Sequence, residues 1–164
     1  MNKANNIKLL LTDCDGVLTD AGVYYSAQGE ELKRFSIRDG MGVERLRNLC
    51  GIDTGIMTGE NSAIVARRAE KLKMAHLYLG IKNKAAQLHA ILEQHGLAAE
   101  EIAFIGDDMN DLEILQLVGL SACPADAMPQ VKAVVDYVCR SDGGRGAFRE
   151  FAEHIIEQRT QILI

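Results

Sequence analysis

The stretch Ile7-Lys8-Leu9-Leu10-Leu11-Thr12-Asp13-Cys14-Asp15-Gly16-Val17 decides the fold that we predict for this chain. Its apolar run, residues 7–11, predicts a buried strand, and two carboxylates follow directly. Alternate residues of an extended backbone share a face, so Asp13 and Asp15 begin on the same side. Gly16 then permits a sharp turn. Because an acidic pair at the tip of a buried strand contributes nothing to stability, it indicates a functional site.

Apolar runs of this kind recur along the chain and alternate with helical segments. Their near-continuous hydrophobicity predicts a mainly parallel sheet covered on both faces, the α/β architecture of a Rossmann-like three-layer sandwich. Right-handed crossovers then bring the carboxyl ends of the strands to one edge, where ligands bind in such sheets. We expect further strands at residues 52–57, 76–79, 102–105, 120–122 and 137–138, and helices at 41–50, 62–74, 84–95, 112–118, 129–134 and 148–158.

Residues 22–38 interrupt this alternation and predict a β-hairpin. Residues 23–25 and 31–37 form its arms, and Gly29 lies in the turn. The hydrophobic alternation of the arms is only partial, so we expect the hairpin to project from the body. Since no repeat and no Pro- or Gly-rich linker divides the chain, the prediction is a single domain over residues 1–164 that carries this hairpin.

The composition narrows the classes of partner. The chain has 164 residues, a net charge of −5 and 48% hydrophobic residues, which fits an ordinary globular core. Its acidic balance argues against binding nucleic acid or an anionic membrane by bulk electrostatics. The four cysteines lack metal-ligand spacing and fit buried thiols in a reducing compartment. With no signal-peptide pattern and no long apolar run, we expect a cytoplasmic protein.

Three polar clusters follow predicted strands and therefore converge at one edge. They are Asp13 with Asp15, Thr58 with Gly59, and the sequence Gly106-Asp107-Asp108-Met109-Asn110-Asp111. So many carboxylates repel one another unless a cation lies among them. Oxygen ligands without nearby histidine or cysteine suit Mg²⁺ better than zinc, and Mg²⁺ commonly completes its shell with water and a substrate phosphate.

These residue types together point to phosphoryl transfer. One carboxylate beside the metal can attack phosphorus, and a second, two residues on, can protonate the leaving alcohol and later deprotonate water. Thr58 offers a hydroxyl and Gly59 an unobstructed N–H to phosphate oxygens. Lys84, at a predicted helix start, can balance the charge, with Lys82 as the alternative. Alone, Asp-x-Asp-Gly is also typical of a turn or of part of a calcium loop, and the other clusters are what favour catalysis.

In this order the motifs resemble those of the haloacid dehalogenase superfamily. The resemblance covers essentially the whole chain and implies Asp13 as nucleophile, Asp15 as general acid and base, and Thr58 and Lys84 on the phosphoryl group. It implies a Mg²⁺ ion held by Asp13, the backbone carbonyl of Asp15 and Asp107. Supporting roles near the metal would fall to Asp108 and Asp111.

The gaps between motifs are too short for a separate cap domain. Among the capless members, this chain resembles the sugar-acid phosphatases that act on 3-deoxy-D-manno-octulosonate 8-phosphate. The resemblance lies in the hairpin, in Arg38-Asp39-Gly40 after it, and in the stretch Gly143-Gly144-Arg145-Gly146-Ala147-Phe148-Arg149-Glu150. The resemblance implies a homotetramer in which a neighbouring subunit covers the site. It also implies that the substrate is bound by Ser36, Ile37, Arg38, Asp39, Gly40, Gly59, Arg68 and Lys84.

One residue departs from that pattern. Glu60 stands where the octulosonate enzymes usually carry arginine, whereas relatives acting on nine-carbon acids (the 9-phosphates of ketodeoxynononate or N-acetylneuraminate) carry glutamate there and a later lysine, which Lys71 matches. We favour the eight-carbon substrate and keep the nine-carbon acids as the alternative. Two other classes stay open: a phosphate-binding module without turnover, and a receiver-like domain, which would accumulate a stable aspartyl phosphate.

Overall fold

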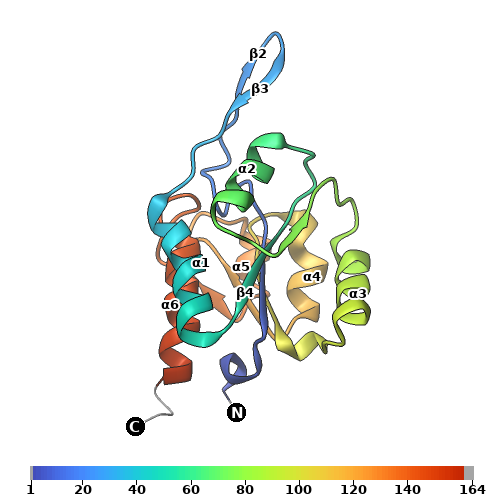
Figure 1. Cartoon of the computed structure of the whole chain (residues 1–164), viewed down its shortest axis with the longest axis vertical. Helices are drawn as coiled ribbons and strands as arrows, with labels where there is room; N and C mark the ends of the chain where they lie inside the picture. The colour runs from blue at the N-terminus through green and yellow to red at the C-terminus, as the bar shows by residue number, and fades with distance from the viewer. Residues whose placement is uncertain (1, 161–164) are drawn as a thin grey trace.

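The computed structural model describes residues 2–160 and contains a six-stranded parallel sheet with helices on both faces (Figure 1). The strand order is β5-β4-β1-β6-β7-β8, which places β1 between β4 and β6. The elements are η1 (Lys3–Asn6), β1 (Leu9–Thr12), β2 (Tyr24–Ser26), β3 (Gly29–Leu32), α1 (Ile37–Cys50), β4 (Asp53–Met57), α2 (Ala63–Lys71), β5 (His76–Tyr78), α3 (Lys84–His95), η2 (Ala99–Glu101), β6 (Ile102–Ile105), η3 (Met109–Asp111), α4 (Leu112–Leu117), β7 (Leu120–Cys123), α5 (Pro129–Lys132), β8 (Tyr137–Val138) and α6 (Ala147–Thr160).

The core lies in two layers, one on each face of the sheet. Side chains alternate along β1, so Leu10 packs with α1, α2 and α6, while Leu9 and Leu11 pack with α3, α4 and α5. All four residues of β1 are buried, which explains why its sequence is continuously apolar rather than alternating. The predicted three-layer α/β sandwich is therefore confirmed.

The hairpin β2–β3 projects from the body beyond the carboxyl ends of the strands, as Figure 1 shows. It is shorter than expected, since β3 ends at Leu32 instead of reaching residue 37. Between β1 and α1 lies only this hairpin, and between β4 and β6 lie only α2, β5, α3 and η2, so within residues 2–160 no separate cap domain exists.

Helix α1 begins at Ile37, four residues earlier than we predicted. The side chain of Ser36 caps it by accepting a hydrogen bond from the Asp39 N–H. Glycines in the first turns lower helix propensity and hid this start. A Cβ at Gly42 would lie 3.3 Å from atoms of Arg149 and Ala152, so a glycine there lets α1 and α6 pack closely.

None of the helices within residues 2–160 is both long enough and apolar enough to traverse a bilayer. The single domain over residues 1–164 stays a prediction, because residue 1 and residues 161–164 lie outside the described part of the chain. The cytoplasmic location also stays a prediction.

Candidate active site

The three predicted polar clusters meet at the carboxyl edge of the central strands. The backbone N–H of Asp13 bonds to Ile105 (3.0 Å) and that of Thr58 to Tyr78 (3.0 Å), so parallel pairing carries both residues one step past their strands. They border a cavity of about 230 Å³. Its lining is polar and consists of Asp13, Asp15, Ala21, Thr58, Gly59, Glu60, Asp107, Asp108 and Asn110.

Lys84 lies beneath this cavity between two carboxylates. Its Nζ is 3.0 Å from Asp13 Oδ1 and 2.6 Å from Asp111 Oδ1, and all three side chains are buried. Burial opposes the charge on Lys84, but the two carboxylates outweigh it and raise the pKa of the lysine. Lys84 is therefore a fixed cation beside the predicted nucleophile, whereas Lys82, the alternative, is exposed; the role of Lys84 toward a phosphoryl group stays a prediction.

The positive charge near Asp13 and Asp107 is too small to keep both carboxyl groups ionised at their ordinary pKa values. Burial and then the charge of Asp111 raise the pKa of Asp13 to about 6, despite the opposing effect of Lys84. Burial and then the charge of Asp13 raise the pKa of Asp107 to about 8. Asp107 Oδ1 is also buried without a hydrogen-bond partner. An orphaned buried carboxylate oxygen beside a second carboxylate is the environment that a cation stabilises.

The donor atoms fit a hard divalent ion. Oxygens of Asp13, Asp107 and Asp111 lie within 4.8 Å of one another. Asp111 is already engaged, since its Oδ1 accepts from Lys84 and its Oδ2 from the N–H groups of Asp107 and Asp108. Asp13 and Asp107 are thus the carboxylates that would hold an ion, with no nitrogen or sulfur among the donors, and this set suits Mg²⁺.

Gly16 sets the distance between the loops after β1 and β6. Its φ is +91°, and a Cβ there would lie 1.9 Å from Asp107 Oδ2. The backbone therefore approaches the Asp107 carboxylate more closely than any side chain permits. The neighbouring thiol does not compete as a nucleophile, because burial and the flanking aspartates raise the pKa of Cys14.

Asp15 faces a lysine that the sequence analysis missed. Lys33 Nζ lies 2.6 Å from Asp15 Oδ1 and 3.0 Å from Glu30 Oε1. The segment Gly29-Glu30-Glu31-Leu32-Lys33-Arg34 is so rich in charge that it resembles a solvated hairpin arm. The one signal in the sequence for a buried lysine was the spacing of Glu30 and Lys33, which places an acidic and a basic residue close together in one hairpin arm.

Several predicted substrate residues lie away from the carboxylate cavity in this chain. Ser36, Ile37 and Arg38 line a separate hollow with Arg34 and Arg145. Asp39 is buried and accepts a hydrogen bond from the Arg149 N–H. Arg68 donates to the Ser36 carbonyl (2.9 Å) beside Gly40, and Lys71 borders another hollow with Gly40 and Arg47. The structure therefore does not bring these three residues to the carboxylate cavity. Their substrate roles stay predictions.

The glycine stretch after β8 is packed tightly, so it is more than a flexible connection. A Cβ at Gly143 would lie 1.9 Å from the Gly16 carbonyl oxygen, and the Gly144 N–H bonds to Val17 (2.8 Å). Glu150 of α6 anchors this stretch by accepting from the N–H groups of Arg140 and Ser141.

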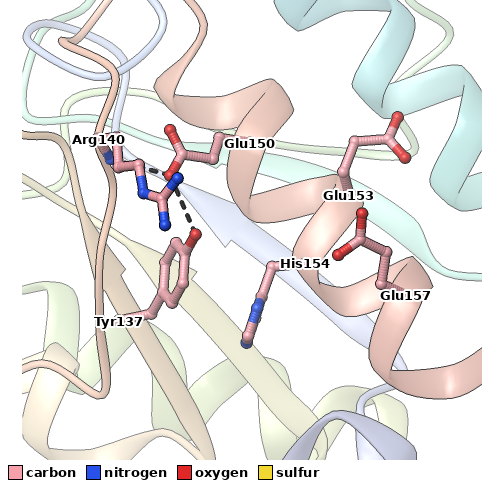
Figure 2. A pocket seen from close by; sticks show the side chains of 6 residues that line it. All are labelled: Tyr137, Arg140, Glu150, Glu153, His154 and Glu157. Carbon is pink, nitrogen blue, oxygen red and sulfur yellow. Dashed lines mark hydrogen bonds between the residues drawn. The ribbon is translucent and has the colours of Figure 1, made fainter. Parts of the chain in front are cut away.

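Figure 2 shows Glu150 at a second pocket, between β8 and α6, with the hydroxyl of Tyr137 directed at it (3.0 Å). The pocket is lined by Tyr137, Arg140, Glu150, Glu153, His154 and Glu157. Glu153 already pairs with Arg45 and Arg149, and His154 stacks on Tyr137 with ring centroids 4.3 Å apart. The contacts of Tyr137 and Glu150 hold α6 against the sheet and the glycine stretch, and the pair of Glu153 with Arg45 joins α6 to α1.

Comparison with known proteins identifies the family. The profile of the haloacid dehalogenase-like hydrolases matches residues 62–149. The 3-deoxy-D-manno-octulosonate 8-phosphate phosphatase KdsC of Escherichia coli (strain K12) is 42% identical over 154 residues, which cover 94% of this chain and 81% of that protein. The chain belongs to the haloacid dehalogenase-like hydrolases. The protein of the same name in Haemophilus influenzae is 40% identical to this chain, over 94% of this chain and 86% of that protein.

Solved structures resemble this haloacid dehalogenase-like hydrolase over almost its full length. The 3-deoxy-D-manno-octulosonate 8-phosphate phosphatase of Moraxella catarrhalis, in complex with magnesium ion, phosphate ion and KDO, has a TM-score of 0.93 and 36% identity, covering 97% of this chain and 91% of that one. The cobalt-bound deoxy-D-mannose-octulosonate 8-phosphate phosphatase of Haemophilus influenzae has a TM-score of 0.92 and 39% identity, covering 96% and 92%. The predicted superfamily and fold are confirmed.

Proposed function

We propose that this protein is a Mg²⁺-dependent phosphatase that hydrolyses 3-deoxy-D-manno-octulosonate 8-phosphate to the free sugar acid and inorganic phosphate. The observation that carries the proposal is the cavity in which Asp13, Asp15, Thr58 and Asp107 meet above the buried Lys84. The eight-carbon substrate is supported by relatives of that activity at 40–42% identity.

Each half of the reaction uses one of the two carboxyl groups of the first motif. In the first half, an oxygen of Asp13 bonds to phosphorus, the bond from phosphorus to the sugar oxygen breaks, and the proton of the Asp15 carboxyl passes to that oxygen. In the second half, water bonds to phosphorus, its proton returns to Asp15, and the bond from phosphorus to Asp13 breaks. Mg²⁺ supplies positive charge that offsets the repulsion between the Asp13 carboxylate and the phosphate.

Fixed groups around the cavity would bind the transferred phosphoryl group. Thr58 is buried, and it borders the cavity together with Gly59. Lys84 holds one oxygen of Asp13 and thereby orients the other. Positioning and charge stabilisation of this kind are the main demands of phosphoryl transfer.

The protein would act as a homotetramer in which a neighbouring subunit covers the cavity. The projecting hairpin supports this part of the proposal, because its side chains Tyr24, Tyr25 and Leu32 are 65%, 72% and 62% exposed, an unusual apolar surface for a short ribbon. Packing of hairpins would bury these side chains. It would also bring the hollow lined by Ser36, Ile37 and Arg38 toward a second copy.

A second candidate substrate class, the nine-carbon acid 9-phosphates, is favoured by one observation. Glu60 is exposed and lines the cavity, at the position where arginine would favour an anionic eight-carbon acid. The deciding experiment compares kcat/KM for the octulosonate 8-phosphate with kcat/KM for the two nine-carbon esters, in saturating Mg²⁺. We expect the eight-carbon ester to be preferred at least about tenfold, and a reversed preference would replace the substrate assignment.

A further inference from the structure

Lys33 is the residue whose position the proposed mechanism leaves unexplained. It lies just beyond β3, at the base of a hairpin whose strand β2 is exposed, and although the residue as a whole is half-buried, its side chain is only 1% exposed. Lysine is almost never buried in this way unless it is paired, because removing its charge from water is costly. The pairing therefore constrains the partner as well as Lys33.

The partner is the carboxyl group that transfers protons. Lys33 Nζ donates to Asp15 Oδ1 at 2.6 Å, and Asp15 is the more exposed member of the pair at 24%. Within residues 2–160, Lys33 is the one side chain that bonds to the Asp15 carboxylate. This contact holds one oxygen of Asp15 and leaves Oδ2 as the oxygen that can carry the proton.

Glu30 holds Lys33, and Ser62 in turn holds Glu30. Glu30 Oε1 accepts from Lys33 at 3.0 Å, and Glu30 Oε2 accepts from the hydroxyl of Ser62 at 2.5 Å. Ser62 caps α2 by accepting from the Val65 N–H, so the chain of contacts ends in a fixed helix of the body. The path Ser62–Glu30–Lys33–Asp15 thus joins α2, the hairpin and the first motif.

We propose that Lys33 is a positioning residue, which holds the Asp15 carboxyl so that Oδ2 meets the leaving oxygen of the substrate, and that Glu30 and Ser62 hold Lys33 in place. This inference rests on the phosphatase function proposed above. Direct binding of substrate by Lys33 is a poorer fit, because its ammonium already donates to two carboxylates and its side chain is enclosed. The hairpin therefore contributes to proton transfer in its own subunit as well as to packing.

The test varies the leaving group, because the contribution of a general acid to the rate increases with the basicity of the leaving oxygen. An alkoxide needs a proton to leave, whereas p-nitrophenolate leaves without one. We compare kcat/KM, which covers the steps up to departure of the leaving group and excludes hydrolysis of the aspartyl phosphate. The substrates are the octulosonate ester, phenyl phosphate and p-nitrophenyl phosphate.

For Lys33→Met we expect kcat/KM to fall about 100-fold on the octulosonate ester and by less than about fivefold on p-nitrophenyl phosphate, with phenyl phosphate between them. The matched control is Lys8→Met, the same change at an exposed lysine at the amino end of β1, which should leave all three values unchanged. Equal losses on all substrates would overturn the proposal in favour of a structural role. A loss confined to the sugar acid and expressed in KM would overturn it in favour of substrate binding.

Glu30→Gln provides the second variant should Lys33→Met fail to fold. It keeps an acceptor for Ser62 but removes the charge that holds Lys33, so the same graded pattern should follow with smaller losses. The two proposals can also fail separately. If the wild-type protein hydrolyses aryl phosphates but not the octulosonate ester, the substrate assignment fails, while the ratio of phenyl to p-nitrophenyl phosphate still decides the role of Lys33.

Discussion

The ammonium of Lys84 lies 3.0 Å from Asp13 Oδ1, and both side chains are almost completely enclosed by protein. The proposed nucleophile is thus ion-paired with a buried lysine of the protein itself. This pairing fixes the direction of the Asp13 carboxylate before any substrate arrives. It also makes the stability of the protein and the chemistry of the site depend on the same few charges.

Replacing Asp13 by asparagine should lower kcat more than about 1,000-fold, because the amide has no anionic oxygen to bond to phosphorus. The shape of the side chain is kept and Lys84 retains Asp111, so the fold should persist. Phosphate release in Mg²⁺ measures the first effect and near-ultraviolet circular dichroism the second. Activity close to that of the wild type would remove Asp13 from its proposed role.

Replacing Lys84 by methionine should lower the free energy of unfolding by about 3 kcal/mol at pH 8, because two buried carboxylates lose their partner. The loss should be smaller at pH 5, where Asp13, with its pKa of about 6, takes up a proton instead. Urea unfolding at both pH values measures this. Lys82→Met, at an exposed position two residues away, is the matched control and should change neither stability nor activity.

Without metal, stability should fall as the pH rises from about 5 to about 8. The pKa values of Asp13 and Asp107 are raised to about 6 and about 8, so at these two sites the folded state keeps protons that the unfolded chain has lost, and this contribution outweighs the opposite one of His76 and His154, whose pKa values burial lowers. Urea midpoints in EDTA should show this decline, and Mg²⁺ at 100 times its dissociation constant should add about 2.7 kcal/mol at pH 8. A midpoint that rises with pH in EDTA would contradict the repulsion argument.

Gly16→Ala should eliminate most activity and the stabilisation by Mg²⁺, because the new Cβ would collide with Asp107 Oδ2 in a backbone conformation that already disfavours alanine. Gly51→Ala is the control. Its φ is +64°, but nothing lies within 4 Å of the added atom, so it should cost only about 1 kcal/mol and leave turnover intact. Melting temperatures with and without Mg²⁺ separate the two results.

Glu150→Gln should destabilise the protein by about 1–3 kcal/mol and reduce activity, although Glu150 lies outside the catalytic cavity. Its Oε1 and Oε2 each accept from a backbone N–H, so an amide would turn its NH₂ group toward a donor. Glu157→Gln, on the same helix and lining the same pocket (Figure 2), should have no effect on either quantity. Equal effects in the two variants would indicate a general loss of charge.

Much of the site could be predicted because its chemistry lies in short motifs at strand ends. Lys84 to His95 and Ile102 to Ile105 were predicted with the bounds that the structure has, since caps and apolar runs mark them locally. The start of α1 was missed because its glycines are explained only by tertiary packing, Gly40 against Arg68 and Leu72 and Gly42 against α6. Lys33 was missed for the same kind of reason, since its ammonium pairs with Asp15, which lies far from it in sequence, and with Glu30, which Ser62 holds.

The order of the strands has a consequence for how activity is gained and lost. Asp13, Thr58 and Asp107 follow three adjacent strands, β1, β4 and β6, whose pairing closes long loops of chain. Pairings of that kind form slowly and only together with the packed interior. A partly folded molecule would therefore hold no fraction of a working site. During synthesis, heating or dilution from denaturant, catalysis should appear and vanish in a single cooperative step with the native sheet, which makes enzyme activity a direct measure of complete folding.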